Sequence, residues 1–156
     1  MNSSAEVRVR RMSAADLGRV LKIAESLPQA PQWPASAYVT AMDAGHRPRR
    51  IALAAELASE QVVGFVVANM VLPEAEVETI AVAIEGQRRG VGSLLLRALT
   101  QELRFEQVSS VVLEVRESNL PALGFYRAHG FEQTGRRPRY YADPEEDAVL
   151  LGLKLI

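Results

Sequence analysis

The sequence of 156 residues contains no cysteine and only two histidines. Without cysteine, disulfide bonds, thiolate metal ligands and a cysteine nucleophile are all excluded. His46 and His129 are too few and too far apart in sequence for a zinc site. His129 precedes Gly130, so we expect it at a helix end, where it would interact with the helix dipole. We therefore predict that the protein holds no metal.

An excess of charge of one sign is also lacking, because 18 basic and 19 acidic residues give a net charge of −1. This balance gives no bulk attraction to nucleic acid. The longest apolar stretch, residues 62–72, is interrupted by Asn69 and is shorter than the roughly 18 residues that cross a bilayer. The first twelve residues carry no apolar signal core. We expect a cytoplasmic protein that binds neither a membrane nor nucleic acid directly.

Arginines gather at three places, and we interpret the first two clusters as solvated edges of strands and turns. The clusters are Arg8, Arg10 and Arg11; Arg47, Arg49 and Arg50; and Arg136, Arg137 and Arg139.

Hydrophobic residues make up 48% of the chain, which suits one globular domain over residues 1–156. Their spacing predicts the element order β-α-α-β-β-β-α-β-α-β-β. The expected strands are 6–12, 50–56, 62–71, 76–83, 110–115, a segment from 131 onward and 148–155. The expected helices run from Ser13 to about Leu27, from after Pro34 to near Gly45, through 91–103, and from Ser118 or Asn119 to Gly130. This order predicts an α/β (α+β) fold, with a mixed central sheet of about six to seven strands and about four helices on both faces.

The strongest chemical signal is the segment from Ile80 to Ser93, where a strand ends and a helix begins at Gly90 and Gly92. Helix N-termini present unpaired N–H groups and the positive end of the dipole, so an anion fits there. Glycines would let a pyrophosphate approach the backbone. A Walker loop is excluded because no lysine follows Gly92, and a Rossmann loop because Leu95 replaces its third glycine. A helix cap with incidental glycines is the structural alternative.

The loop Gln87-Arg88-Arg89-Gly90-Val91-Gly92 resembles the coenzyme A pyrophosphate loop of the GNAT N-acetyltransferases, Gln/Arg-x-x-Gly-x-Gly/Ala. The preceding Ile80-Ala81-Val82 is similar to the strand that pairs with the pantetheine arm in that family. The segments from Leu113 to Asn119 and from Phe125 to Phe131 complete the pattern in order and at family spacing. The resemblance therefore implies the GNAT fold, with acetyl-CoA as cosubstrate.

Within the superfamily, the chain most resembles the RimI group of ribosomal-protein N-terminal alanine acetyltransferases. Leu113 to Asn119 matches that group's Leu-Glu-Val-Arg-x-Ser-Asn. Arg137 to Tyr141 matches its Arg-x-x-Tyr-Tyr, followed by Glu146-Asp147-Ala148 as in the group. Gln32-Trp33-Pro34 is similar to its Pro-Trp substrate loop. The cofactor-binding residues that the resemblance implies are Ile80, Ala81, Val82, Gln87, Arg88, Arg89, Gly90, Val91, Gly92, Ser93, Asn119 and Tyr126.

Glu114 is the first candidate for a general base, because it lies within the apolar run 111–115, where an acid is out of place. Burial would raise its pKa and make it a better base near neutrality. An outward-facing strand acid is the alternative. Glu78 is the second candidate, because many GNAT enzymes carry at this position an acid that serves as general base. RimI relatives usually have an apolar residue at this position. Either acid could serve, or both could act through a shared water.

The resemblance implies that Tyr126 is the acid that points at the thioester sulfur, although a core aromatic is the structural alternative. For the oxyanion we expect the backbone N–H of Val82 as donor. A bulge that splays this strand from the Glu114 strand would open a slot for the acetyl group. Because cysteine is absent, we predict direct transfer within a ternary complex.

Trp33, Tyr140 and Tyr141 are the candidate walls of the acceptor site, and each could equally serve packing.

Three functional interpretations remain open from the sequence. The first, RimI-like interpretation predicts acetylation of a protein N-terminus, such as a ribosomal-protein alanine. The second is acetylation of a small amine. A non-catalytic acyl-CoA sensor is the third, and Glu114 and Tyr126 argue against it. The sequence carries no signal for the oligomeric state.

Overall fold

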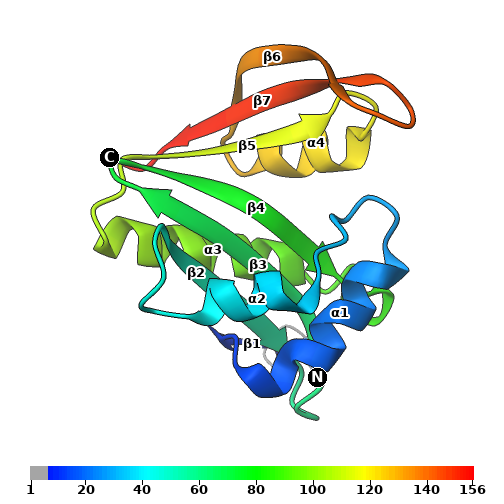
Figure 1. Cartoon of the computed structure of the whole chain (residues 1–156), viewed down its shortest axis with the longest axis vertical. Coiled ribbons are helices and arrows are strands. Elements are labelled where there is room, and N and C mark those ends of the chain that lie inside the picture. Colours follow the sequence, from blue (N-terminus) through cyan, green and yellow to red (C-terminus); the bar gives the residue numbers. More distant parts are fainter. Residues whose placement is uncertain (1–6) are drawn as a thin grey trace.

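The computed structural model describes residues 7–156, and its elements follow the predicted order (Figure 1). The strands are β1 (Arg8–Arg11), β2 (Arg49–Glu56), β3 (Val62–Val71), β4 (Glu74–Val82), β5 (Ser110–Arg116), β6 (Glu132–Tyr141) and β7 (Glu146–Lys154). The helices are α1 (Leu17–Ser26), α2 (Ala35–Met42), α3 (Val91–Phe105) and α4 (Leu120–Ala128), with short 3-10 helices at Ala14–Asp16 and Ile84–Gly86. The first strand was expected from Glu6, which lies outside the described residues, and α2 ends earlier than predicted.

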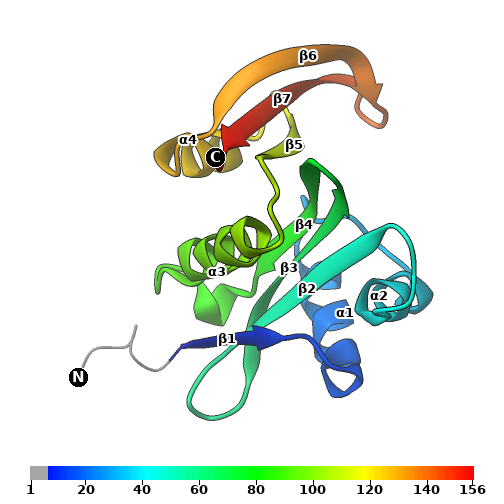
Figure 2. The ribbon, with the colours of Figure 1, turned by 90° about the vertical axis from the view of Figure 1, so that its left-hand side faces the viewer.

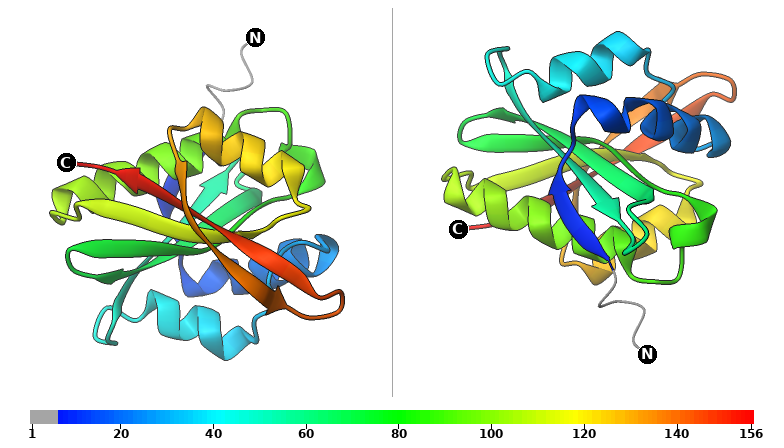
Figure 3. Two further views of the ribbon diagram at one scale, coloured as in Figure 1. Left: turned by 90° about the horizontal axis from the view of Figure 1, so that it is seen from above. Right: turned by 90° about the horizontal axis from the view of Figure 1, so that it is seen from below.

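The strands form one sheet of seven in the order β1-β2-β3-β4-β5-β7-β6. The β4–β5 pair is parallel and the other pairs are antiparallel, so the predicted mixed sheet is confirmed. Helices α1 and α2 cover one face, and α3 and α4 the other (Figures 2 and 3). Across residues 7–156, no helix is both long and apolar enough to cross a membrane.

The predicted bulge lies in β4. Val77 pairs with Ala68 and Thr79 with the adjacent Val67, so Glu78 is the extra residue. Strands β4 and β5 pair only from Glu74 to Glu76, opposite residues 110–112. Beyond this point the two strands diverge (Figure 1). The divergence opens the middle of the sheet on the side where β4 runs into α3.

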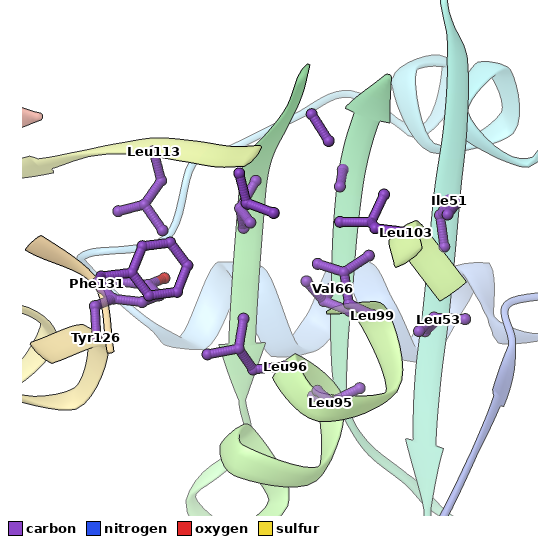
Figure 4. Close-up of a cluster of buried hydrophobic side chains, with 14 of the residues drawn as sticks. Ile51, Leu53, Val66, Leu95, Leu96, Leu99, Leu103, Leu113, Tyr126 and Phe131 are labelled. Atoms are coloured by element: carbon purple, nitrogen blue, oxygen red, sulfur yellow. The ribbon is translucent and has the colours of Figure 1, made fainter. Parts of the chain in front are cut away.

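Apolar faces hold both layers against the sheet. Leu95, Leu99 and Leu103 of α3 are fully buried, as the helical spacing predicted, and pack with Ile51 and Val66 (Figure 4). Each such side chain contributes about 1.5–3 kcal/mol relative to exposure. On the opposite face, a second cluster joins α1 and α2 to β2, β3 and β4. The two layers fix the position of both strands that border the opening.

The first helical segment begins at Ser13 as predicted, but with a 3-10 turn. The Asp16 carboxylate accepts the Ser13 N–H at 2.8 Å, the capping-box contact. Arg10 donates to both oxygens of Asp16 and holds the pKa of that carboxyl below its ordinary value. Arg10 also pairs with the buried Glu56, so this member of the first arginine cluster is not part of a solvated edge.

Candidate functional site

A cleft of about 1070 Å³ occupies the gap between β4 and β5. It brings together segments from the Trp33 loop, the end of β4, the predicted phosphate loop, α4 and the β6–β7 hairpin. The predicted residues that line it are Trp33, Glu78, Ile80, Ala81, Val82, Gln87, Arg88, Gly90, Val91, Gly92, Ser93, Glu114, Asn119, Tyr126, Tyr140 and Tyr141. Arg89 is not among the residues that line the cleft, so its contact with the coenzyme stays a prediction.

The β4 edge offers free backbone groups to the cleft. Ala83 N–H donates to Val63 O at 2.8 Å, which fixes the hydrogen-bonding phase of the β3–β4 ladder. Because antiparallel ladders alternate, the N–H of the neighbouring Val82 points away from β3, toward the side that β5 has left. Gln87 reaches the same side and donates to Val82 O at 3.1 Å. The arrangement can accept a hydrogen-bonding molecule along β4.

The predicted phosphate loop ends at the N-terminus of α3. Gly90 is the N-cap and has a φ of 74°, a conformation that favours glycine. The Val91 side chain is fully buried in the core, so only its backbone can reach a ligand. The helix start therefore provides backbone N–H groups next to open space, as an anion site requires.

Gly92 has a packing role that the sequence did not reveal. A Cβ added there would lie 3.3 Å from two ring atoms of Phe125 and 3.8 Å from a methyl group of Val82. The residue therefore lets α3 and α4 approach each other at the floor of the cleft. The expected backbone approach to a pyrophosphate remains a prediction, and the two reasons for glycine are compatible.

Helix α4 contributes Asn119 and Tyr126 to the cleft. Asn119 caps the helix, with its side-chain oxygen accepting the Ala122 N–H at 3.3 Å. Tyr126 is 7% exposed and packs edge-on against Phe131 at 5.4 Å between ring centroids. Burial raises the pKa of Tyr126, so its phenol keeps its proton at neutral pH. Tyr126 is thus a core aromatic that also borders the cleft. At the end of α4, His129 Nδ1 lies 2.9 Å from Phe125 O, in the predicted helix-end position.

Glu114 faces the cleft from β5. Its carboxylate lies 3.2 Å from Arg137 of β6, and its side chain is 17% exposed. The same carboxylate raises the pKa of Tyr140. Glu114 is therefore paired with Arg137 and interacts with Tyr140, two residues of the Arg-x-x-Tyr-Tyr segment.

Glu78, the bulge residue, also lines the cleft. Arg50 of β2 donates to it at 2.8 Å, and both side chains are largely shielded from solvent. The ion pair therefore fixes the Glu78 carboxylate next to the slot.

Glu76 is a third carboxylate in the cleft, and it was not among the candidates from the sequence. Burial raises the pKa of Glu76, and the nearby Glu114 and Glu78 raise it further. Among residues 7–156, Glu76 takes part in no ion pair. The signal that could have found it is the Glu-x-Glu spacing, because alternate strand residues share a face. Between these acids and Ile80, the hydroxyl of Thr79 is buried and has no partner among the described residues.

Aromatic side chains border the other end of the cleft. Trp33 packs on Tyr38 with ring centroids 5.1 Å apart, while Tyr140 is 49% exposed. Tyr141 lies under the guanidinium of Arg116 at 4.4 Å, and its ring is edge-on to Tyr140. Trp33 and Tyr141 therefore serve packing and also line the cleft, whereas Tyr140 is the more accessible wall.

Comparison with known proteins gives a consistent family match. Residues 19–131 match the model of the Acetyltransferase (GNAT) family. Over 100 residues the chain is 38% identical to the ribosomal protein bS18-alanine N-acetyltransferase of Salmonella typhimurium, a match that covers 63% of this chain and 68% of that protein.

Solved structures agree with this match along nearly the whole chain. The crystal structure of the ribosomal-protein-S18-alanine N-acetyltransferase from Escherichia coli superposes with a TM-score of 0.81 at 27% identity, covering 96% of this chain and 94% of that one. Ard1 from Thermoplasma volcanium gives a TM-score of 0.84 at 29% identity, covering 97% of this chain and 99% of that one.

Proposed function

The chain belongs to the acetyltransferase (GNAT) family, and from this premise we propose that it acetylates the N-terminal α-amino group of a protein, first of all an N-terminal alanine of a ribosomal protein. The observation that carries the proposal is the single cleft that holds the phosphate loop, Glu114 and Tyr126 together. The acceptor follows from the 38% identity to a protein named as a bS18-alanine acetyltransferase.

Acetyl-CoA fits the cleft as cosubstrate. The start of α3 offers N–H groups for the pyrophosphate at Gly90, Val91 and Gly92, where no side chain fills the approach to Gly90. The open edge of β4 at Ile80 to Val82 offers ladder partners for the amides of the pantetheine arm. Asn119 and Tyr126 border the far side of the same space.

The chemistry needs one proton acceptor and one proton donor. The acceptor's amine nitrogen attacks the thioester carbonyl carbon, and its proton passes to Glu114. The carbonyl oxygen gains negative charge and is stabilised by the N–H of Val82. As the carbon–sulfur bond breaks, the phenol of Tyr126 gives its proton to the departing sulfur. The products are an N-acetylated amine and the free thiol of coenzyme A.

Two other carboxylates compete with Glu114 for the role of base. Glu78 was the alternative from the sequence, but its carboxylate is already engaged in an ion pair with Arg50. Burial raises the pKa of Glu76, and the neighbouring Glu114 and Glu78 raise it further, which is the direction that makes a carboxylate a better base. Glu114 remains the first candidate because it lies on β5, the strand that matches the Leu-Glu-Val-Arg-x-Ser-Asn motif. A comparison of the turnover of the Glu76→Gln, Glu78→Gln and Glu114→Gln variants ranks the three carboxylates as bases.

A small amine is the second candidate acceptor. The observation that favours it is the acidic slot, because Glu76 and Glu78 add carboxylates near Glu114. Such a slot attracts a protonated amine whether that amine belongs to a peptide or to a small molecule. The sensor interpretation is weaker, because a non-catalytic protein has no need of Glu114 and Tyr126 in one cleft.

A thiol-release assay with acetyl-CoA tests the proposed acceptor. The acceptors are short peptides that begin with alanine or serine, the same peptides with a blocked N-terminus, and a panel of small amines. We expect turnover with the free alanine peptide and none with its blocked twin. Turnover confined to small amines would replace the peptide acceptor while keeping the enzyme class.

A further inference from the structure

The β6–β7 hairpin departs from regular strand geometry at the cleft. Tyr140 and Tyr141 are consecutive, yet both line the cleft, whereas consecutive residues of a regular strand point to opposite faces. Arg137 and Tyr140 are three residues apart, yet Arg137 pairs with Glu114 and the Glu114 carboxylate also raises the pKa of Tyr140. The cause is an irregularity in the pairing, because Arg137 pairs with Ala148 and Tyr141 with Glu146.

Three residues of β6 are therefore opposed by one residue of β7, Asp147. The middle residue of the three, Arg139, has a φ of 53°, in the left-handed region that L residues rarely adopt. That conformation turns the chain so that Tyr140 points to the same face as Tyr141. The hairpin arches at the end of the sheet beyond β5 (Figure 2). Because the conformation of Arg139 is unfavourable, a contact is needed to hold the bulge in place.

We propose that Asp147 is a positioning residue that holds the bulge and so brings Tyr140 and Arg137 onto Glu114. Its carboxylate accepts the backbone N–H of Arg139 at 3.0 Å, and its second oxygen lies 3.0 Å from Arg136. Its backbone oxygen accepts the Glu117 N–H at 3.2 Å, which ties the bulge to the end of β5. Asp147 does not line the cleft and acts through the residues that do.

This proposal gives a role to the Glu146-Asp147-Ala148 segment. Glu146, the neighbouring acid, accepts the Ser118 N–H at 2.8 Å and lies 3.2 Å from Arg116, so it binds the turn before Asn119. The two acids thus hold different parts of the site. Asp147 sets the acceptor wall, and Glu146 fixes the β5–α4 turn on the coenzyme side.

The proposal rests on the proposed function, and steady-state kinetics of Asp147→Ala test it in that context. We expect KM for the acceptor to rise about tenfold or more, within the range that a misplaced binding group costs, while KM for acetyl-CoA changes less than about twofold. Asp147→Asn keeps an oxygen that can accept the Arg139 N–H and should recover most of the loss. Equal changes in both KM values would overturn the proposal.

Glu145→Ala is the matched control. Glu145 lies in the same hairpin and pairs with the side chain of Arg139 at 3.3 Å, but both groups are largely exposed. It removes the same charge without touching the backbone contact, so we expect wild-type KM for both substrates. An effect as large as that of Asp147→Ala would assign the role to hairpin charge instead.

An ultraviolet titration of Tyr140 tests the inference without any turnover. The wild-type curve minus that of Tyr140→Phe isolates one phenol, whose pKa the Glu114 carboxylate raises above its ordinary value. In Asp147→Ala, or in Asp147→Val if the alanine variant does not fold, we expect this phenol to titrate at lower pH. An unchanged titration sinks the positioning role even if the enzyme acetylates peptides, and a shift supports it even if no peptide is acetylated.

Discussion

The two walls of the cleft differ in the chemical groups that they present, backbone groups on one and side chains on the other. The wall that we propose for the coenzyme, formed by the β4 edge and the start of α3, presents mainly backbone groups and glycine. The wall that we propose for the acceptor presents charged and aromatic side chains. Two of its acids have a partner from another strand, as Glu114 has Arg137 and Glu78 has Arg50. A backbone wall can be disturbed only by changing chain conformation or packing. A side-chain wall can be altered one group at a time.

The largest expected effect breaks the coenzyme wall. Gly92→Val places a branched side chain against the ring of Phe125, 3.3 Å from the new Cβ, and at the predicted pyrophosphate site. We expect calorimetry to show no binding of coenzyme A. Gly18→Val is the control, because nothing lies within 4 Å of the Cβ added at that helical glycine. Normal affinity in Gly92→Val would remove the loop from the coenzyme site.

The next effect alters the acceptor wall alone. Glu114→Gln removes the first-choice base and should lower kcat by about 100-fold or more, the range for general-base catalysis. Coenzyme binding should survive, because Glu114 lies on the opposite wall. Glu76→Gln and Glu78→Gln, made in parallel, should cost less; if either costs more, that residue takes the role of base.

A third prediction concerns Tyr126, which is buried in the core and also lines the cleft. Its pKa is raised in the folded protein, so the stability it gives is complete below the unfolded value near 10 and is lost as pH rises beyond it. Tyr126→Phe has no proton to lose. In urea unfolding, we expect the wild type to lose stability relative to this variant by about 1.4 kcal/mol per pH unit above pH 10. Parallel pH curves would contradict the burial of the phenol.

The smallest effect separates two neighbouring arginines. Arg88 lines the cleft and Arg89 does not, although the sequence made both candidates. We expect Arg89→Ala to change KM for acetyl-CoA less than about twofold, because a charge outside the cleft is screened by salt. Arg88→Ala should raise it more. The reverse order would mean that the loop presents its other side to the phosphates.

The sequence predicted the coenzyme wall better than the acceptor wall, for a physical reason. Glycine at a helix start and a strand before it are local patterns, so Gly90, Gly92 and the β4 edge could be identified from residues within one segment. A bulge in β4 was expected, although its position at Glu78 was not, and the inward face of Glu114 was the first of two alternatives. The pairings of Arg50 with Glu78 and Arg137 with Glu114 join residues 28 and 23 positions apart, and nothing in one sequence links them. Glu76 was missed because its raised pKa arises first from burial and then from Glu114 and Glu78, which lie on two strands.

The divergence of β4 from β5 leaves the inner edge of a strand without a neighbour in the middle of a sheet. On an outer surface, the unpaired backbone groups of such an edge would pair with another protein chain and favour aggregation. Here the Trp33 loop and the β6–β7 hairpin border the gap, which leaves room for a slender amide-bearing molecule to act as a substitute strand. The amide hydrogens of Ile80 and Val82, which point away from β3, should then exchange quickly with heavy water in the free protein and slowly when acetyl-CoA is bound. The sheet would become continuous only while acetyl-CoA is bound.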